Sequence, residues 1–408
     1  MLSTFKVEGF KSLFETEVEL GAFNVFIGAN GSGKSNLLKA IGVMSAAAFG
    51  SVEPETLRYR GVRPGLPALY KTLFKSRRFR RLITMTAAAG DATYRLGLSN
   101  PIEEPSFRWT IASESLRDRD RPLVSRTPAE CKLFDAKGKS ETIAPDPDQT
   151  VARLALARRE NTVAARGLLD DLVNFAIYTP TTTVLRGIAV EEVARDPLGL
   201  TGGGLPETVK QLVDRAAGTL GPFDLDEVWE MIEWAEEMSA VPAPQASVSP
   251  AVKTTPIVLR FRDRYMRPER NTLSAYDASE GALHVLFMLA LVSHDKAPRF
   301  FAVDNFDQAL HPRLARALTR LLADQVAKDG TRQVLATPHN PLVLDGLDLT
   351  NPAIRLFAVD RNREGATQVR RIEVSPELLA EAESGLSLSR LWVMGRLGGL
   401  FRGGTVSC

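Results

Sequence analysis

The sequence predicts an α/β fold with an N-terminal antiparallel β subdomain and a mainly helical insertion. Three observations predict it. A glycine-rich turn at 28–35 separates a short apolar strand at 24–27 from a helix at 36–44. Three short strand-like segments lie between residues 82 and 112, divided by Gly90-Asp91 and Asn100-Pro101. Apolar strands and amphipathic helices return in the last third, where two strands end close to Asp304 and His339.

Composition limits the classes of protein that the chain can belong to. Its 408 residues are 44% hydrophobic, enough for a large core and for two or three domains. The net charge of +2 provides no overall basic field for nucleic acid. Cys131 and Cys408 are the only cysteines, which favours a reducing compartment. No apolar run approaches the ~18 residues of a membrane span, and no signal peptide is indicated. A cytoplasmic protein without membrane partners is therefore expected.

Three segments are expected along the chain. Residues 1–112 form an N-terminal lobe with the glycine-rich loop and the β subdomain. Residues 113–255 form an insertion with helices at 151–159, 164–175, 207–217 and 224–238, and it ends in a proline-rich linker at 241–256. Residues 256–408 form a C-terminal lobe.

The segment GANGSGKS at 28–35 fits the phosphate-binding P-loop pattern at every required position. Its glycines let successive backbone N–H groups point at phosphate oxygens, and the following helix N-terminus adds partial positive charge. Lys34 can reach the β- and γ-phosphates, and the Ser35 hydroxyl can ligate Mg²⁺. ATP and Mg²⁺ are therefore the predicted cofactors, and an ordinary glycine-rich turn is the alternative. The residues predicted to bind the nucleotide are Gly28, Asn30, Gly31, Ser32, Gly33, Lys34, Ser35 and Asn36.

The last third supplies further groups that an ATPase needs. An apolar strand at 300–303 ends in Asp304, the pattern in which a carboxylate supports the metal ion. The segment ASEG places Ser279 and Gly281 at a helix start, where they could present a hydroxyl and bare N–H groups to a phosphate. The strand at 333–337 leads to His339, which could sense the γ-phosphate or the attacking water. Taken singly, the three motifs also fit a buried strand, a serine N-cap and a surface histidine.

The order of these motifs resembles the ABC-type ATPases of the SMC, RecF and OLD group. It most closely resembles prokaryotic predicted AAA-family ATPases with ABC-like heads. The resemblance rests on FKVEGFKSLFETEVELGAFNVFIGANGSGKSNLLKAI, on ASEGALHVL as signature, on FFAVDNFDQALHPRLARAL as Walker B with D-loop, and on ATPHNPLVLD as His switch. The segments YRGVR, VLRG and LSLSRLWVMGRLGG are similar to a subgroup often encoded beside a Toprim-like nuclease of the RloB type.

The resemblance implies a head that works as a homodimer around two ATP molecules. One subunit's P-loop holds ATP, and the partner's Ser279 and Gly281 close over the γ-phosphate. Asp304 then supports the metal, Asp307 lies in the D-loop, and His339 is the switch. Lys11 and Ser12 are predicted to be solvent-exposed turn residues, with contact to ribose or adenine as the alternative. An effector or nuclease encoded nearby is the expected further partner.

The sequence departs from the family pattern at two places. The family usually has Glu after the Walker B aspartate, to orient or deprotonate the attacking water, whereas this chain has Asn305. An amide cannot act as a general base, and losing such a group commonly costs ~10²–10⁴ in rate. Slow hydrolysis is therefore predicted, and Asp307 is the candidate replacement. The usual Q-loop glutamine is also missing from its place, since the first glutamine of the chain is Gln149.

Three functions are compatible with these motifs. The favoured one is a dimerising ATPase that acts as a switch or assembly platform in anti-phage defence or nucleic-acid maintenance, a role inferred from the resemblance alone. The second is a non-hydrolysing ATP-binding scaffold for an effector, which Asn305 supports. The third, a transporter ATPase, is disfavoured by the ~250 residues between Lys34 and Gly281 and by the missing Q-loop.

A basic segment between Arg58 and Arg81 is a candidate DNA or RNA contact surface. It contains aromatic residues and no Asp or Glu. The alternative is a solvated face that pairs with the acidic helix expected at 224–237. Its basic residues are Arg58, Arg60, Arg63, Lys71, Lys75, Arg77, Arg78, Arg80 and Arg81.

Overall fold

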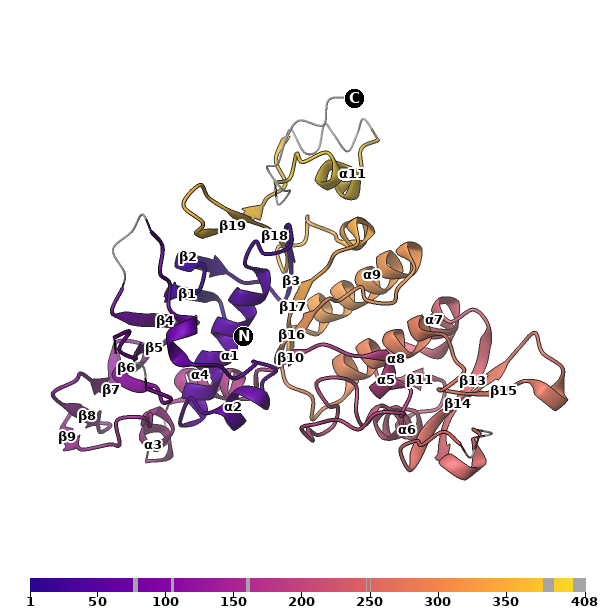
Figure 1. Cartoon of the computed structure of the whole chain (residues 1–408), viewed down its shortest axis with the longest axis horizontal. Helices are drawn as coiled ribbons and strands as arrows, with labels where there is room; N and C mark the ends of the chain where they lie inside the picture. Colours follow the sequence, from indigo (N-terminus) through magenta and orange to yellow (C-terminus); the bar gives the residue numbers. More distant parts are fainter. Residues whose placement is uncertain are drawn as a thin grey trace.

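An antiparallel sheet of eight strands forms one layer of the protein (Figure 1). The computed structural model describes residues 1–75, 80–103, 106–158, 162–246, 248–249, 251–376 and 385–398. The strand order in this sheet is β2-β1-β4-β5-β6-β7-β8-β9. Alternating burial along β1 and β4 follows the period of two that the sequence shows. The bounds are β1 (Thr4–Phe10), β2 (Leu13–Glu19), β4 (Leu82–Ala89), β5 (Ala92–Ser99), β6 (Thr110–Asp118), β7 (Arg121–Arg126), β8 (Cys131–Phe134) and β9 (Ser140–Ile143).

A second sheet of six strands lies at the centre and carries the predicted motifs at its strand ends. Its order is β10-β16-β17-β3-β18-β19, with neighbouring strands parallel except for β19, which pairs antiparallel with β18. The three strands that precede the P-loop, Asp304 and His339 are therefore neighbours. The bounds are β3 (Phe23–Ile27), β10 (Ile177–Tyr178), β16 (Phe300–Asp304), β17 (Gln333–Thr337), β18 (Ile354–Arg361) and β19 (Thr367–Ile372).

Both faces of the central sheet are covered, so its inner strands β3 and β17 are buried throughout rather than alternating. On one face Phe26 and Phe300 belong to a core shared with α1 (Lys34–Phe49), α4 (Val163–Asn174) and the antiparallel sheet. On the other face Val25 and Phe301 belong to a core shared with α6 (Leu205–Arg215), α8 (Glu280–Ser293) and α9 (Pro312–Asp329). The helices α1 and α8 thus lie on opposite sides of one sheet (Figure 1).

Shorter elements complete the fold. A three-stranded sheet, β13-β14-β15, lies beyond α6 and α7, and a β11-β12 pair leads into α7. The remaining bounds are α2 (Pro54–Arg58), η1 (Pro67–Tyr70), α3 (Ala152–Ala157), α5 (Thr182–Leu185), β11 (Thr219–Leu220), β12 (Phe223–Asp224), α7 (Leu225–Met231), β13 (Ala235–Pro242), η2 (Ala243–Gln245), β14 (Ile257–Asp263), η3 (Pro268–Arg270), β15 (Thr272–Ser274), η4 (Pro341–Gly346) and α11 (Leu388–Val393).

The structure differs from expectation in residues 113–255. The expected boundary at 112 falls inside β6, which pairs with β5 on one side and, over residues 114–118, with β7 on the other. The antiparallel sheet then continues through β8 and β9 to Ile143. Helices therefore occupy less of this segment than expected. The helix predicted over 224–238 ends at Met231, and its second half is β13, which pairs with β14. The predicted linker at 241–256 mainly connects these two strands and contains η2.

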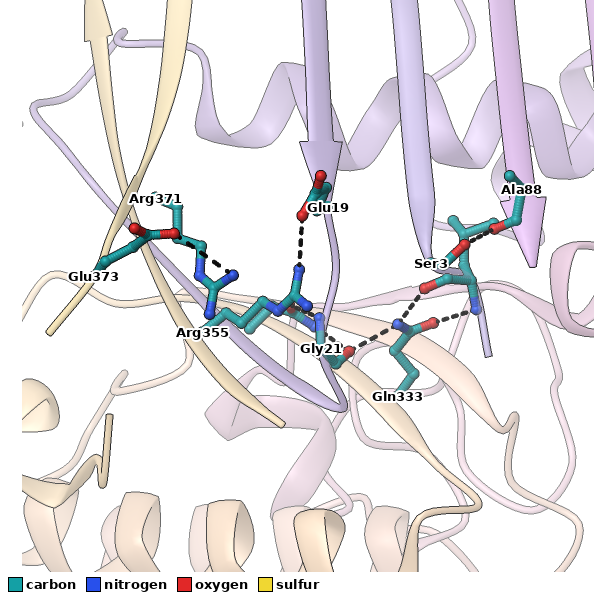
Figure 2. Close-up of polar contacts among 10 residues, drawn as sticks. Ser3, Glu19, Gly21, Ala88, Gln333, Arg355, Arg371 and Glu373 are labelled. Atoms are coloured by element: carbon teal, nitrogen blue, oxygen red, sulfur yellow. Dashed lines mark hydrogen bonds and ion pairs between the residues drawn. The ribbon is translucent and has the colours of Figure 1, made fainter. Parts of the chain in front are cut away.

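Gln333, the first residue of β17, joins the two sheets where their strands begin. Its side chain accepts a hydrogen bond from Leu2 N (2.9 Å) and donates to Leu2 O (2.7 Å) and Gly21 O (2.8 Å). Figure 2 shows Gln333 between the Gly21 turn and the segment that carries Ser3, with the Arg355–Glu19 ion pair at 3.7 Å beyond the turn. Gln333 is 1% exposed, so water cannot replace these bonds.

Replacing Gln333 with Ala is expected to lower the free energy of unfolding by about 3 kcal/mol, because it leaves buried backbone groups without partners. The matched control is Gln368→Ala, since Gln368 is an exposed strand residue. Urea denaturation of the three proteins measures the effect. Equal midpoints for Gln333→Ala and Gln368→Ala would contradict a stabilising role for the Gln333 amide.

Candidate nucleotide-binding site

The glycine-rich loop runs from the end of β3 into the N-terminus of α1, as predicted. The backbone φ is 157° at Gly28 and 120° at Gly33, values that residues with a side chain rarely adopt. Close neighbours add a second restriction. A Cβ at Gly28 would collide with the Val359 carbonyl oxygen, and one at Gly33 would collide with the Thr367 side chain. The loop therefore requires glycine at these two positions.

Lys34 is folded back over the loop. Its Nζ donates to Gly28 O (2.5 Å) and Ala29 O (3.2 Å), and the residue is 6% exposed. Burial lowers the pKa of Lys34, whereas the charges of Asp304 and Asp307 act in the opposite direction. The Lys34 ammonium group is thus held within the loop by two backbone carbonyl groups. A phosphate oxygen could take their place as hydrogen-bond acceptor.

Asp304 and Ser35 meet because β16 and the P-loop end at the same edge of the sheet. The Ser35 hydroxyl donates to Asp304 Oδ2 at 3.0 Å. Thr337, the last residue of β17, donates its hydroxyl to Asp304 Oδ1, and the same hydroxyl accepts from Asn305 N at 3.2 Å. The predicted pair for the metal ion is therefore brought together. Thr337 is a third residue of this hydrogen-bonded group. The sequence analysis did not identify it, although Thr337 ends the strand that leads to His339.

The turn after Asp304 holds the remaining predicted residues. Asn305 has φ 58°, which asparagine tolerates better than most residues. His339 Nε2 lies 3.1 Å from Asn305 Oδ1, so the ring nitrogen donates and the amide oxygen accepts. Asp307 accepts from the backbone N–H groups of His339 (3.0 and 3.1 Å) and Asn340. Both oxygens of Asp307 are engaged in fixing the His339 loop, which disfavours Asp307 as a replacement base.

The predicted signature residues are not brought to the P-loop of the same chain. Ser279 caps α8, accepting from Ala282 N at 3.3 Å, and Gly281 lies beside Ala309 and Leu314. This helix packs on the opposite face of the central sheet from α1. Within the described residues, no hydrogen bond joins Ser279 or Gly281 to the P-loop.

Ser12 and Thr367 form a second group that contacts the P-loop. The prediction that Ser12 is solvent-exposed is wrong, since it is 4% exposed and its hydroxyl accepts from Asn36 Nδ2 at 2.8 Å. Its neighbour Lys11 is partly buried, with Nζ 4.6 Å from the centre of the Tyr70 ring. Thr367 on β19 touches both Ser12 and the loop. No sequence signal pointed to Thr367.

Three of the nine basic residues between Arg58 and Arg81 are committed to contacts within the fold. Arg60 is 2% exposed and donates to Ser45 Oγ (2.6 Å), Thr56 O (2.8 Å) and Val173 O (3.0 Å). Burial, followed by the charge of Arg195, lowers the pKa of Arg60 to about 10. Lys71 is 7% exposed and bonds to Asn100 O, and Arg80 pairs with Glu8 at 2.8 Å.

These contacts remove Arg60, Lys71 and Arg80 from the predicted nucleic-acid surface, which stays a prediction for the other basic residues. The suggested pairing with an acidic helix is also wrong for Glu236 and Glu237, which lie on β13 and pair with Arg262. Arg77 and Arg78 lie outside the described residues. Arg58, Arg63, Lys75 and Arg81 are exposed.

The donor set fits a magnesium ion held jointly with phosphate. Among the described residues, no group of three His, Cys, Asp or Glu side chains could hold a metal alone. Mg²⁺ is usually bound through one or two protein oxygens, substrate phosphates and water, which matches Ser35 and Asp304. Ser32 Oγ is buried without a hydrogen-bond partner, a further polar group at the loop that a ligand could satisfy. No described helix has the length and apolar character needed to cross a membrane.

Comparisons with known proteins point to ATPase domains at both ends of the chain. Residues 1–68 match the family described as "AAA ATPase domain", and residues 237–345 match "AAA domain, putative AbiEii toxin, Type IV TA system". No curated protein matches the chain. The two matched segments contain the P-loop and the Ser279 and Asp304 motifs respectively.

Several solved structures are similar at low identity. A crystal structure of the SMC head bound to the C-winged helix domain of ScpA has 14% identity and a TM-score of 0.49, covering 91% of this chain and 98% of that one. The Smc head domain with an extended coiled coil bound to the C-terminal domain of ScpA, from Pyrococcus furiosus, has 13% identity and a TM-score of 0.47, covering 94% and 99%. The SMC head domain from Thermotoga maritima has 14% identity and a TM-score of 0.39, covering 91% and 99%.

The two family matches agree with the predicted resemblance to ATPase domains over residues 1–68 and 237–345. The mixed α/β fold with its antiparallel β layer agrees with the predicted fold class. The ATPase domain carries with it the capacity to bind nucleotide. The roles of the individual site residues stay predictions.

Proposed function

We propose that this chain is a slowly hydrolysing ATPase that dimerises around ATP and acts as a switch or assembly platform. The observation that carries the proposal is the Ser35–Asp304 contact at 3.0 Å. It joins the two matched ATPase segments at the mouth of a P-loop whose lysine is buried. Slow hydrolysis, dimerisation and the biological role are the parts that require testing.

The hydrogen bonds among the site residues involve groups that ATP and Mg²⁺ would contact. Lys34 exchanges the carbonyls of Gly28 and Ala29 for phosphate oxygens, so its charge stays paired in a buried place. Ser35 and Asp304 are the residues that would hold the metal ion. A bound Mg²⁺ would neutralise charge on the phosphates. The hydroxyl of Thr337 keeps Asp304 in position throughout.

Slow hydrolysis follows from the chemistry of Asn305. Its amide can orient a water molecule but cannot take the proton. His339 Nε2 is bonded to the Asn305 oxygen, and Asp307 is occupied by backbone N–H groups. Neither the Asp304 nor the Asp307 carboxylate is therefore placed as an uncommitted base. The same geometry supports the alternative of a non-hydrolysing scaffold.

A dimer is proposed because Ser279 and Gly281 lie across the sheet from the P-loop of their own chain. A second copy can place them over the γ-phosphate, and symmetry then creates two such sites. In the cell, we propose a role in anti-phage defence or nucleic-acid maintenance with an effector or nuclease as partner. The AbiEii-type family match at 237–345 supports a defence or toxin–antitoxin context.

Mixing two inactive variants tests the shared site. Lys34→Ala removes the phosphate-binding ammonium, and Ser279→Arg blocks the signature. Each variant alone is expected to lose ATP turnover, whereas an equimolar mixture is expected to regain about a quarter of wild-type turnover. Half of random dimers are mixed, and each mixed dimer has one intact site. Turnover of the wild type should also rise with protein concentration.

Lys328→Ala, in the last turn of α9, is the matched control for Lys34→Ala and should retain wild-type turnover. Wild-type turnover without recovery in the mixture would contradict the shared site. Tight ATP binding with no wild-type turnover at any concentration would favour the non-hydrolysing scaffold instead.

A further inference from the structure

The β18–β19 hairpin lies against the P-loop through one buried threonine. Thr367, the first residue of β19, is 2% exposed. Its Oγ1 is 2.7 Å from the Ser32 carbonyl oxygen and 2.7 Å from Ser12 Oγ. A hydroxyl has one hydrogen, and the carbonyl can only accept. Thr367 therefore donates to the Ser32 carbonyl, and Ser12 supplies the hydrogen between the two hydroxyls.

Two further bonds hold Thr367 in this place. Its backbone N–H donates to Ser12 O at 2.7 Å, and Ser12 Oγ accepts from Asn36 Nδ2 at 2.8 Å. The group thus connects the β1–β2 turn, the first turn of α1 and β19 around the loop. Because each member is buried or half-buried, the positions of the hydroxyl groups are well determined by their partners.

The bond to Ser32 determines where the next N–H group points. In a trans peptide the C=O and the following N–H point in opposite directions. Because the Ser32 carbonyl points at β19, the Gly33 N–H points away from β19. Gly33 is also in contact with Thr367, and its φ of 120° is a value that glycine adopts readily. Backbone N–H groups are what a P-loop offers to phosphate.

We propose that Thr367 is a positioning residue that holds the Ser32–Gly33 peptide in the orientation needed to bind ATP phosphates. This inference rests on the proposed function, since it concerns the same site. Thr367 itself does not touch the nucleotide. Without the Thr367 hydroxyl, the Ser32–Gly33 peptide can rotate, and the Gly33 N–H is no longer held in the orientation that binds the ligand. Part of the free energy of ATP binding is then spent on ordering this peptide.

Binding of Mg²⁺–ATP to the full chain tests the proposal. Thr367→Val keeps the shape of the side chain and removes the hydroxyl, and about tenfold weaker ATP binding is expected. Thr367→Ser keeps the hydroxyl and should restore affinity to within about twofold of wild type. The matched control is Thr319→Val, which removes a buried hydroxyl bonded to Ala315 O within α9. It should leave ATP affinity unchanged.

Thermal denaturation without nucleotide separates a role in positioning from a role in folding. A purely structural role predicts that Thr367→Val and Thr319→Val have equal effects on the melting temperature and equal effects on ATP affinity. Wild-type ATP affinity in Thr367→Val would overturn the inference. If Thr367→Val does not fold, Thr367→Ala gives the same comparison, and wild-type affinity there overturns it. Failure of the wild type to bind ATP would instead contradict the proposed function.

Discussion

Replacing Asn305 with Glu is expected to raise ATP turnover about 10²-fold, because it places a carboxylate base beside the attacking water. The residue follows Asp304 directly, and its side chain already reaches the imidazole of His339 at 3.1 Å. A carboxylate can accept the same hydrogen bond from Nε2, so His339 need not move. Turnover under ATP saturation, measured at a protein concentration that favours dimers, gives the effect.

Two features of this substitution allow a sharp comparison. Asn305→Gln has the length of the Glu variant without a base, so it should stay at or below wild-type turnover. Both variants place a longer side chain at φ 58°, where it costs about 1 kcal/mol of stability relative to asparagine. A shared loss of stability with a gain of turnover only in the Glu variant supports the hypothesis. Equal turnover of the two variants would contradict it.

The sequence predicted the central sheet well because its motifs occur at strand ends. Parallel strands bring their carboxyl ends to one edge of a sheet, so the sequence alone makes it reasonable to expect Ser35, Asp304 and His339 close together. The sequence did not predict the order of β16, β17 and β3 in the sheet, which the structure shows. The residue types at the strand ends and the strand topology both indicate the same site here, so such a site can be predicted from the sequence.

Other parts of the site could not be predicted, because they depend on distant pairings. Thr367 reaches Ser12 from 355 positions away in the chain, and nothing around Thr367 distinguishes it from any strand threonine. Arg60 shows the opposite case. It appeared to be part of a cationic surface, but its carbonyl and hydroxyl partners come from α1, α2 and α4. Composition predicts charge, whereas tertiary contacts decide whether that charge is exposed.

Replacing Glu114 with Ala is expected to lower the free energy of unfolding by about 4 kcal/mol. Glu114 lies on β6 and is 1% exposed. Its carboxylate accepts from Val151 N (2.9 Å), Ala152 N (3.0 Å) and the Tyr94 hydroxyl (3.1 Å). The substitution leaves these three donors buried without an acceptor and detaches the start of α3 from the sheet.

The matched control is Glu141→Ala on β9 of the same sheet, where Glu141 is exposed and pairs with Arg158 at 3.1 Å. Exposed ion pairs contribute little, so this variant should lose at most about 1 kcal/mol. Urea denaturation of both variants tests the difference. Similar midpoints would show that the buried carboxylate does not anchor α3.

The same carboxylate makes stability depend on pH. Burial raises the pKa of Glu114, although the hydrogen bonds it accepts and the charge of Arg126 oppose the shift. The folded protein therefore holds this proton more tightly than the unfolded chain. The resulting contribution is fully present below the ordinary pKa of a glutamate and is lost as the pH rises through the raised value. Glu114→Gln cannot titrate, so the wild type should lose stability relative to Glu114→Gln over that pH range. A difference in unfolding free energy that is constant with pH would contradict the raised pKa.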